Sequence, residues 1–276
     1  MSGSDDPLDV ARDAADRAGE VLLRYFRDGV AARPKDARNG MPGEAAPLTY
    51  DLVSDADLES ERVVLELLRQ RRPHDAVMSE ETRHEIVQAD RLWIVDPLDG
   101  TNNFAHGIPH FAVSIGYLEQ GEPRVGVVYN PVTGDRFIAC AGRGATLNGR
   151  PITAASTERL DESLVGVGFY YDRGAMMQST LAAIEEFFGR SIHGVRRMGT
   201  ASLDLCYVAS GRFGVFFEYE LAPWDYAAGA LLVTEAGGRI TDGRGGSLKW
   251  DRTSIVASAP ALHEAAIDIV RRHHPA

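Results

Sequence analysis

Hydrophobic positions near the N-terminus recur every three or four residues, which predicts one amphipathic helix over residues 5–28. Ser4 is the expected N-cap, and Pro7 stands in the first turn, where proline is well tolerated. The next segment, residues 31–50, mixes prolines, glycines and charges without any period. This composition predicts a loop or a mobile hairpin before the next element.

A second helix is expected to begin directly after Ser54. Asp57, three positions later, completes a capping-box pattern and would lie in the first helical turn. Apolar residues continue at helical spacing as far as "RQRRP" at residues 69–73, where cationic side chains lie at the negative end of the helix dipole. The pattern therefore predicts both ends of this helix.

The middle of the chain changes to the pattern of strands. Short apolar runs at residues 75–80 and 91–96 are typical of strands, and residues 110–152 alternate strand-like runs with Gly, Pro and Asn turns. These features predict an antiparallel meander. Further elements are expected to alternate as follows: strands at 163–169, 213–218 and 253–259, and helices at 178–188, 200–210, 224–237 and the C-terminal end.

This alternation predicts an α/β arrangement in the second half of the chain. We therefore expect an α+β N-terminal half, residues 1–155, and an α/β C-terminal half, residues 156–276. No linker longer than a turn separates the halves, and no repeat or low-complexity tract occurs. The two halves are expected to pack as one unit.

Composition narrows the possible functions. A chain of 276 residues that is 44% hydrophobic can bury a substantial core. Its net charge of -11 disfavours a general nucleic-acid or anionic-membrane surface, which would need a basic face. Two distant cysteines, Cys140 and Cys206, supply neither a disulfide framework nor a zinc site. The acidic N-terminus and the lack of a long apolar run predict a soluble cytoplasmic protein.

Candidate chemistry is concentrated in acidic residues at the ends of predicted elements. These residues are Asp57, Glu80, Asp96, Asp99 and Asp225. Each of them alone could cap a helix or a turn. In "DPLDG", however, Pro97 biases Asp96 away from helix, and Gly100 lets the backbone approach a ligand. The turn would direct both carboxylates and the Leu98 carbonyl toward one point.

Converging carboxylates repel one another unless a hard dication lies between them, and an all-oxygen ligand set favours Mg²⁺. Gly100 and Thr101 would begin a helical turn whose N–H groups could hold an anion, so the candidate substrate is a phosphoester. The chain has no GxxxxGK[ST] loop, which disfavours nucleotide binding of the P-loop kind. The following histidines lack the spacing of a zinc site and are interpreted as surface or core residues: His74, His84, His106 and His110.

Three segments together resemble a known family. "SEE" at residues 79–81, "WIVDPLDGTNNF" at 93–104 and "PWDYAAGALLVTEAGG" at 223–238 are similar, in order and spacing, to the signatures of the inositol monophosphatase family of Mg²⁺-dependent, lithium-sensitive phosphatases. The similarity continues through "DLVSDADLESE", "GATLNGRPI" and "HGVRRMGTASLDLCYVASG" and covers nearly the whole chain. It implies a layered α-β-α-β-α sandwich and a homodimer.

The resemblance also implies roles for individual residues. The implied metal ligands are Glu80, Asp96, Asp99, Asp225 and the Leu98 carbonyl. Two or three Mg²⁺ per site are implied, with Mn²⁺ as a possible substitute. Glu80 and Thr101 would hold the attacking water, with Asp57 in support, and Gly100 and Thr101 would bind the phosphate. The implied polyol contacts are Asp99, Gly199, Ala201, Glu218 and Asp225. For Glu218, a solvated carboxylate on an edge strand is the alternative.

The leading hypothesis is therefore Mg²⁺-dependent hydrolysis of a small phosphorylated polyol, with inositol 1-phosphate first among the substrates. Fructose 1,6-bisphosphate, histidinol phosphate, nucleoside 3',5'-bisphosphate and NADP are alternatives within the same class. A non-catalytic regulatory protein is an alternative from another class, and neither nucleic acid nor membrane is an expected partner. Four residues could meet a second phosphate or form structural ion pairs: Tyr170, Arg173, Arg196 and Arg197. No residue of the predicted mobile loop is assigned a role.

Overall fold

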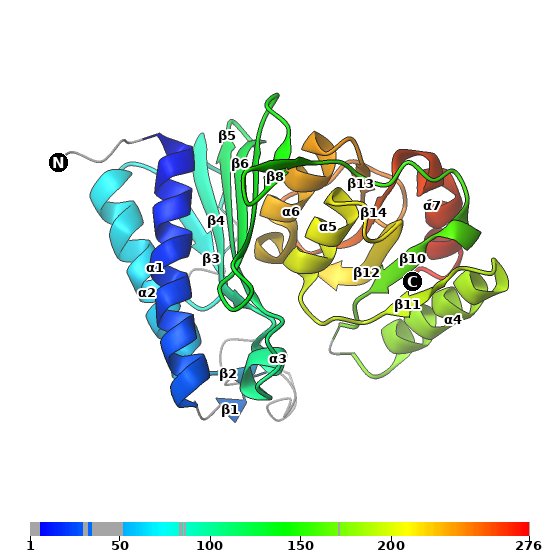
Figure 1. The fold of residues 1–276 in the computed structure, drawn as a ribbon, viewed down its shortest axis with the longest axis horizontal. Coiled ribbons are helices and arrows are strands. Elements are labelled where there is room, and N and C mark those ends of the chain that lie inside the picture. Colours follow the sequence, from blue (N-terminus) through cyan, green and yellow to red (C-terminus); the bar gives the residue numbers. More distant parts are fainter. Residues whose placement is uncertain are drawn as a thin grey trace.

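The computed structural model describes residues 6–29, 33–34, 52–82, 85, 87–170 and 172–275. Its elements form five layers, α-β-α-β-α (Figure 1). Helices α1 (Pro7–Asp28) and α2 (Asp55–Arg71) cover the outer face of a seven-stranded sheet. The central layer holds α5 (Ala201–Ala209) and α6 (Pro223–Glu235), and the far layer holds α4 (Ala175–Gly189) and α7 (His263–Arg272). The expected layered sandwich is confirmed.

The first sheet has the strand order β3-β4-β5-β6-β7-β8-β9. Its strands are β3 (Ala76–Ser79), β4 (Arg91–Asp99), β5 (Ala112–Glu119), β6 (Glu122–Asn130), β7 (Asp135–Cys140), β8 (Ala145–Leu147) and β9 (Arg150–Ile152). Only the first pair, β3 with β4, is parallel, and every later pair is antiparallel. The predicted meander is confirmed, because β5 to β9 lie side by side in sequence order and each pair is antiparallel. Short turns can join such neighbours directly.

The second sheet has the strand order β11-β10-β12-β14-β13. Its strands are β10 (Leu164–Val167), β11 (Gly194–Arg196), β12 (Val215–Leu221), β13 (Arg239–Thr241) and β14 (Thr253–Ser258). The strand expected at residues 213–218 begins two residues later and ends three residues later than predicted. Strands β11 and β13 were not predicted, because a strand of three residues is too short to show a period of two.

The two N-terminal helices test the predicted caps. The N-cap of α1 is Asp6, whose side chain accepts a hydrogen bond from the Leu8 N–H at 2.8 Å, so the predicted Ser4 cap is wrong. Pro7 is the first helical residue, which places the cap directly before it. The capping box of α2 is confirmed, since the Ser54 N–H donates to Asp57 Oδ2 at 2.8 Å. Most of the loop predicted at residues 31–50 lies outside the described residues. The described part of this loop is the short strand β1 (Arg33–Pro34), which pairs antiparallel with β2 (Leu52–Val53), just after the loop.

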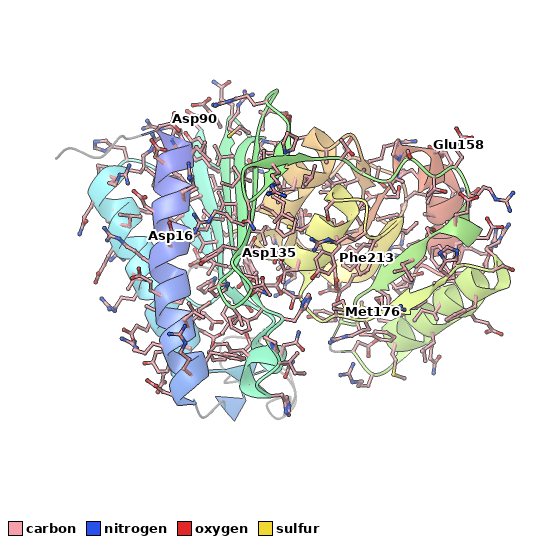
Figure 2. All side chains as sticks on the ribbon, in the orientation of Figure 1. Asp16, Asp90, Asp135, Glu158, Met176 and Phe213 are labelled. Atoms are coloured by element: carbon pink, nitrogen blue, oxygen red, sulfur yellow. The ribbon has the colours of Figure 1, made fainter. Side chains whose placement is uncertain are left out.

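Helix α6 packs directly on the first sheet through glycines of that sheet. A Cβ atom at Gly126 would lie 2.7 Å from the Ala228 carbonyl oxygen, and one at Gly116 would lie 3.1 Å from Ala227 Cβ. Side chains fill the space on both sides of the central layer, and Phe213 lies between α5 and the second sheet (Figure 2). This contact fixes the N-terminus of α6, where Asp225 stands, relative to β5 and β6.

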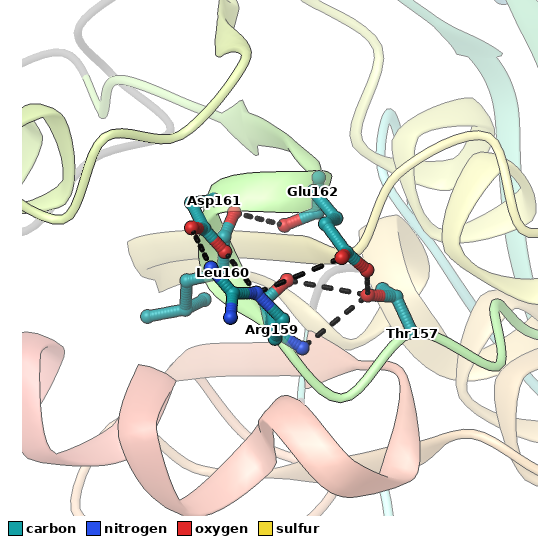
Figure 3. Close-up of polar contacts among 6 residues, drawn as sticks. Thr157, Arg159, Leu160, Asp161 and Glu162 are labelled. Carbon is teal, nitrogen blue, oxygen red and sulfur yellow. Dashed lines mark hydrogen bonds and ion pairs between the residues drawn. The ribbon is translucent and has the colours of Figure 1, made fainter.

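The segment that connects the two sheets is shaped by its own polar contacts. Arg159 pairs with Asp161 and Glu162, and the Thr157 hydroxyl donates to Glu162 at 2.8 Å (Figure 3). These side chains are largely exposed and close in sequence, so they shape the segment more than they bind the halves together. The division of the chain near residue 155 stays a prediction. Within the described residues, no helix combines the length and the apolar character needed to cross a lipid bilayer.

Acidification is expected to destabilise the fold through His263, the first residue of α7. Its ring nitrogens lie 2.8 Å from Ser258 Oγ and 3.1 Å from Thr241 Oγ1, and the side chain is buried. Burial, reinforced by Arg239 and opposed by Glu264, lowers the pKa of His263 from 6.5 to about 4. The folded state therefore binds fewer protons than the unfolded state between these two values. Stability should fall as the pH falls through this window, by about 3 kcal/mol in all.

The measurement is the free energy of unfolding in urea at several pH values between 7 and about 4, for the wild type and for His263→Gln. The variant cannot take up the proton, so its stability should depend less on pH in this window. An equal pH dependence in both proteins would contradict the assignment to His263.

Candidate active site

The first part of the site forms where β3 and β4 end side by side. The two strands are parallel, and Ser79 is in register with Val95, so Glu80 and Asp96 emerge at the same edge of the sheet. The Glu80 N–H donates to the Val95 carbonyl at 3.3 Å. The Glu80 carboxyl group lies close enough to Asp96 for its charge to add to the rise that burial causes in the pKa of Asp96.

The "DPLDG" segment differs from the predicted turn. Strand β4 continues through it, with a register shift between Asp96 and Asp99, and pairing resumes where Asp99 faces Ala112. The Leu98 N–H donates to Asp96 Oδ1 at 3.0 Å across this irregularity. Gly100 then has φ +93°, and a Cβ atom there would lie 2.4 Å from Thr200 Oγ1, so only glycine fits.

The predicted helical turn after Gly100 is confirmed as α3 (Thr101–Ala105). Thr101 Oγ1 lies 3.0 Å from Asp57 Oδ1 and 3.1 Å from the Leu98 carbonyl oxygen. The other oxygen of Asp57 accepts from Ser54, so this carboxylate caps α2 and also contacts Thr101. Capping and the contact with a site residue are therefore not alternatives for Asp57.

Helices α5 and α6 supply the remaining carboxylate contacts. The Ser202 N–H, in the first turn of α5, donates to Asp99 Oδ2 at 2.7 Å. Asp225 stands in the first turn of α6, and its Oδ2 accepts from the Ala222 N–H at 2.7 Å. The Asn103 amide donates to the Met198 carbonyl at 2.8 Å, which ties α3 to the segment before α5. The N-termini of α3, α5 and α6 thus meet at the end of β4.

Burial and mutual repulsion act together on these carboxyl groups. Burial first, and then the charges of Glu80, Asp99 and Asp225, raise the pKa of Asp96 well above its usual value. Burial also raises the pKa of Asp99 to about 6, although hydrogen bonds from Ser202 lower it. For Asp225, burial and the charges of Glu80 and Asp99 raise the pKa well above its usual value. A cation among these groups would offset this electrostatic cost.

The residues fit a hard cation in donor chemistry and in charge, since every side-chain donor is a carboxylate oxygen. In the part of the chain that the structure describes, no three His, Cys, Asp or Glu side chains are spaced as a closed metal-binding group. Burial, together with the mutual charges of the carboxylates, nevertheless raises three of their pKa values. The carboxylates therefore lie near one another without converging on a single point, as expected for like charges that repel.

The substrate residues implied by the resemblance lie on the second sheet and at the start of α5. Glu218 is 7% exposed and belongs to β12, between β10 and β14, so the alternative of a solvated edge-strand carboxylate is wrong. Burial raises the pKa of Glu218 to about 8, against the Arg197 charge, which lowers it. Gly199, with φ +83°, stands two residues before Ala201, the first residue of α5.

The other candidate residues are divided between this region and the surface. Burial raises the pKa values of Glu218 and of Asp204, a buried α5 residue that was not predicted, and the Arg197 charge opposes this rise in both. Arg196 is exposed and donates to the Val195 carbonyl at 2.9 Å, and Arg173 donates to the Tyr170 carbonyl at 3.3 Å. Among the histidines, His74 and His106 are exposed, His110 is half-buried, and His84 lies outside the described residues.

Two further site contacts escaped the sequence analysis because they come from one face of α2. The Ser60 hydroxyl donates to the Pro97 carbonyl at 2.9 Å, and Glu61 Oε1 accepts from the Thr82 N–H at 3.0 Å. With Asp57 they occupy positions i, i+3 and i+4, which lie on one side of a helix. Three polar residues at this spacing on an otherwise apolar face were the available signal.

Comparison with known proteins places this geometry in a family. The model of the inositol monophosphatase family matches residues 5–274. A putative Nus factor SuhB from Neisseria meningitidis serogroup B is 40% identical over 267 residues, 96% of this chain and 98% of the relative. An inositol-1-monophosphatase from Rhizobium meliloti is 39% identical over 270 residues, 97% of each chain.

The structures agree with the sequences. The fold matches that of Thermotoga maritima IMPase with a TM-score of 0.83 at 31% identity, covering 97% of this chain and 98% of that one. The similarity therefore extends over both sheets and over every segment that contributes a carboxylate to the site. The chain belongs to the inositol monophosphatase family.

Proposed function

We propose that this protein is a Mg²⁺-dependent phosphomonoesterase acting on a small phosphorylated polyol. The observation that carries the proposal is the placement of Glu80, Asp96, Asp99 and Asp225 at the end of β4, where α3, α5 and α6 begin. These four carboxylates and the Leu98 carbonyl would hold the metal. When bound there, Mg²⁺ supplies charge that polarises the phosphoryl group, acidifies a water molecule and neutralises the leaving oxygen. Two or three ions per site are proposed, with Mn²⁺ as a substitute.

Thr101, Asp57 and Glu80 would orient the attacking water. The Thr101 hydroxyl lies 3.0 Å from Asp57 Oδ1, and when it donates to that oxygen its own lone pairs are left to accept from water. Glu80 would accept a hydrogen bond from the second O–H of the same water, which directs the water lone pair toward phosphorus. Asp57 thus acts through Thr101 and holds its hydroxyl in one rotamer.

The remaining residues would position the ester. Backbone N–H groups in the first turn of α3, at Gly100 and Thr101, would bind phosphate oxygens, because a helix leaves its first N–H groups without carbonyl partners in the helix. The polyol would contact Gly199, Ala201 and Glu218. Burial raises the pKa of Glu218 to about 8, so near neutral pH this group can donate a hydrogen bond to a polyol oxygen as well as accept one.

Inositol 1-phosphate is the proposed substrate, supported by the name of the Rhizobium meliloti relative. The test is phosphate release from inositol 1-phosphate, fructose 1,6-bisphosphate, histidinol phosphate, a nucleoside 3',5'-bisphosphate and NADP, with Mg²⁺ and again with excess EDTA. The highest kcat/KM should belong to inositol 1-phosphate, and EDTA should abolish release. Release that persists in EDTA would contradict the metal assignment. A higher kcat/KM for another of these substrates would change the substrate assignment alone.

Lithium is expected to inhibit the enzyme more strongly as Mg²⁺ rises. Asp225, with Asp96 and Asp99, would form a second and weaker cation site on the leaving-group side. A small monovalent ion can replace Mg²⁺ there after cleavage, but it carries half the charge and neutralises the products poorly. Initial rates should show inhibition that excess substrate does not relieve, and Asp225→Glu should weaken it. Simple competition between lithium and substrate would contradict the two-site arrangement.

A second candidate function is partner binding, which the name of the Neisseria meningitidis relative, a putative Nus factor, favours. The net charge of -11 argues against broad direct contact with nucleic acid and in favour of a protein partner. Sedimentation of the purified protein with Nus factors of the same organism tests this role. Binding that survives Asp96→Asn would make it independent of catalysis, and absence of binding would remove it.

We also propose a homodimer in the cytoplasm. Helix α4 supports the dimer, since Leu181 is 50% exposed and Phe188 is 54% exposed on the same side of the helix. Two exposed apolar side chains on one side of a helix favour a contact with another protein surface. The two free cysteines, Cys140 and Cys206, are in keeping with a reducing compartment. Equilibrium sedimentation would give the mass, and a monomer at micromolar concentration would contradict the dimer.

A further inference from the structure

Glu61 belongs to α2 and is buried, with an exposed fraction of 1%. A buried carboxylate is costly unless hydrogen bonds compensate it. Within the described residues, the donors to Glu61 Oε1 come from one short turn: the Ser79 hydroxyl, the Glu81 N–H at 3.3 Å and the Thr82 N–H at 3.0 Å. One carboxylate oxygen thus holds residues on both sides of Glu80.

We propose that Glu61 is a positioning residue that holds the Glu80 turn in place and thereby sets the affinity of the site for Mg²⁺. The inference rests on the proposed function, because it takes Glu80 as a metal ligand. Glu61 has no metal-binding role of its own in this proposal. Its Oε1 atom accepts from three donors, and through them Glu61 acts on the metal by way of residues 79–82.

Contacts from Glu61 hold the far side of this turn. Strand β3 ends at Ser79, and the Glu80 N–H still bonds to Val95, so the near side belongs to the sheet. After Glu80 the chain leaves the sheet, and the Glu81 and Thr82 N–H groups donate to Glu61 Oε1. Repulsion from Asp96 and Asp99 would drive the Glu80 carboxylate outward if the turn could move.

The same helix face also holds the other parts of the site. Asp57 contacts Thr101, Ser60 contacts the Pro97 carbonyl, and Glu61 contacts the Glu80 turn. Side chains at i, i+3 and i+4 keep fixed spacings, so α2 sets the separation between the Glu80 turn and the "DPLDG" segment. Groups that orient ligands in this way affect metal affinity by about 10- to 100-fold.

The experiment measures Mg²⁺ binding by isothermal titration calorimetry, without substrate, and Mn²⁺ binding by electron paramagnetic resonance. Glu61→Ala should raise the Kd of both ions by about 10- to 100-fold. Glu61→Gln keeps one acceptor oxygen and should lose less. Ser79→Ala removes one donor and leaves Glu61 intact, so it should weaken binding even if Glu61→Ala fails to fold.

Glu235→Ala is the matched control. The Glu235 carboxylate also accepts two N–H groups of a turn, those of Gly142 at 2.8 Å and Gly144 at 2.7 Å, but that turn carries no site residue. This variant should lower Tm and leave the Kd for Mg²⁺ unchanged. A purely structural Glu61 would behave in the same way.

Glu80→Gln separates the proposal from the function on which it rests. If Glu80→Gln weakens Mg²⁺ binding but Glu61→Ala and Ser79→Ala do not, Glu61 is structural and the inference is overturned while the phosphatase stands. If Glu80→Gln also leaves Mg²⁺ binding unchanged, both the assignment of Glu80 as a metal ligand and the inference about Glu61 are wrong. Weaker binding in the Glu80, Glu61 and Ser79 variants, with Glu235→Ala unchanged, is the result we expect.

Discussion

Asp96→Asn is expected to lower kcat by about 1,000-fold, which corresponds to about 4 kcal/mol of transition-state stabilisation. The substitution keeps the shape of the side chain and the acceptor for the Leu98 N–H, but it removes a charge that would bind the metal. Steady-state phosphate release at saturating inositol 1-phosphate, over a range of Mg²⁺ concentrations, is the measurement.

The same substitution should not destabilise the metal-free protein. Burial and the neighbouring carboxylates raise the pKa of Asp96 above its unfolded value, so its charged form opposes folding at neutral pH. A neutral amide removes that cost, and the Tm without metal should equal or exceed that of the wild type. Asp90→Asn, the same change at the exposed residue just before β4 (Figure 2), is the control and should leave kcat unchanged. Near-normal turnover of folded Asp96→Asn at modest Mg²⁺ would contradict the ligand assignment.

Thr101→Ala is expected to reduce kcat by about 100-fold while costing only about 1 kcal/mol of stability. The hydroxyl lies 3.0 Å from Asp57, and in the proposed mechanism it orients the attacking water. Without it the water keeps one fewer partner, whereas the fold loses only the contacts of the hydroxyl with Asp57 and the Leu98 carbonyl. Pre-steady-state phosphate release and urea unfolding measure the two effects separately.

Thr101→Ser distinguishes orientation of water from packing. Serine keeps the hydroxyl and loses the methyl group, so it should recover most of kcat. Loss of stability with intact kcat in Thr101→Ala would show that Thr101 serves the helix alone.

Local sequence was sufficient for much of the fold because the interactions involved are local. The capping box joins Ser54 and Asp57, three residues apart, and the meander of residues 110–152 needs only alternating side chains and short turns. The position of two acidic residues of the candidate site could also be predicted, since "DPLDG" concentrates Asp96 and Asp99 within a few positions. Errors arose at short range where two residues competed for one role, as with Ser4 and Asp6 at the first cap.

The supports of the site depended on tertiary packing. Glu61 and Thr82 are 21 residues apart, Asn103 and Met198 are 95 apart, and Asp99 and Ser202 are 103 apart. No local preference selects such partners, because each hydrogen bond forms only after the layers have packed and excluded water. The sequence by itself determined which residues could carry the chemistry. The packing of α2, α5 and α6 around the end of β4 decided which groups hold those residues, because burial there makes every unpaired polar group costly.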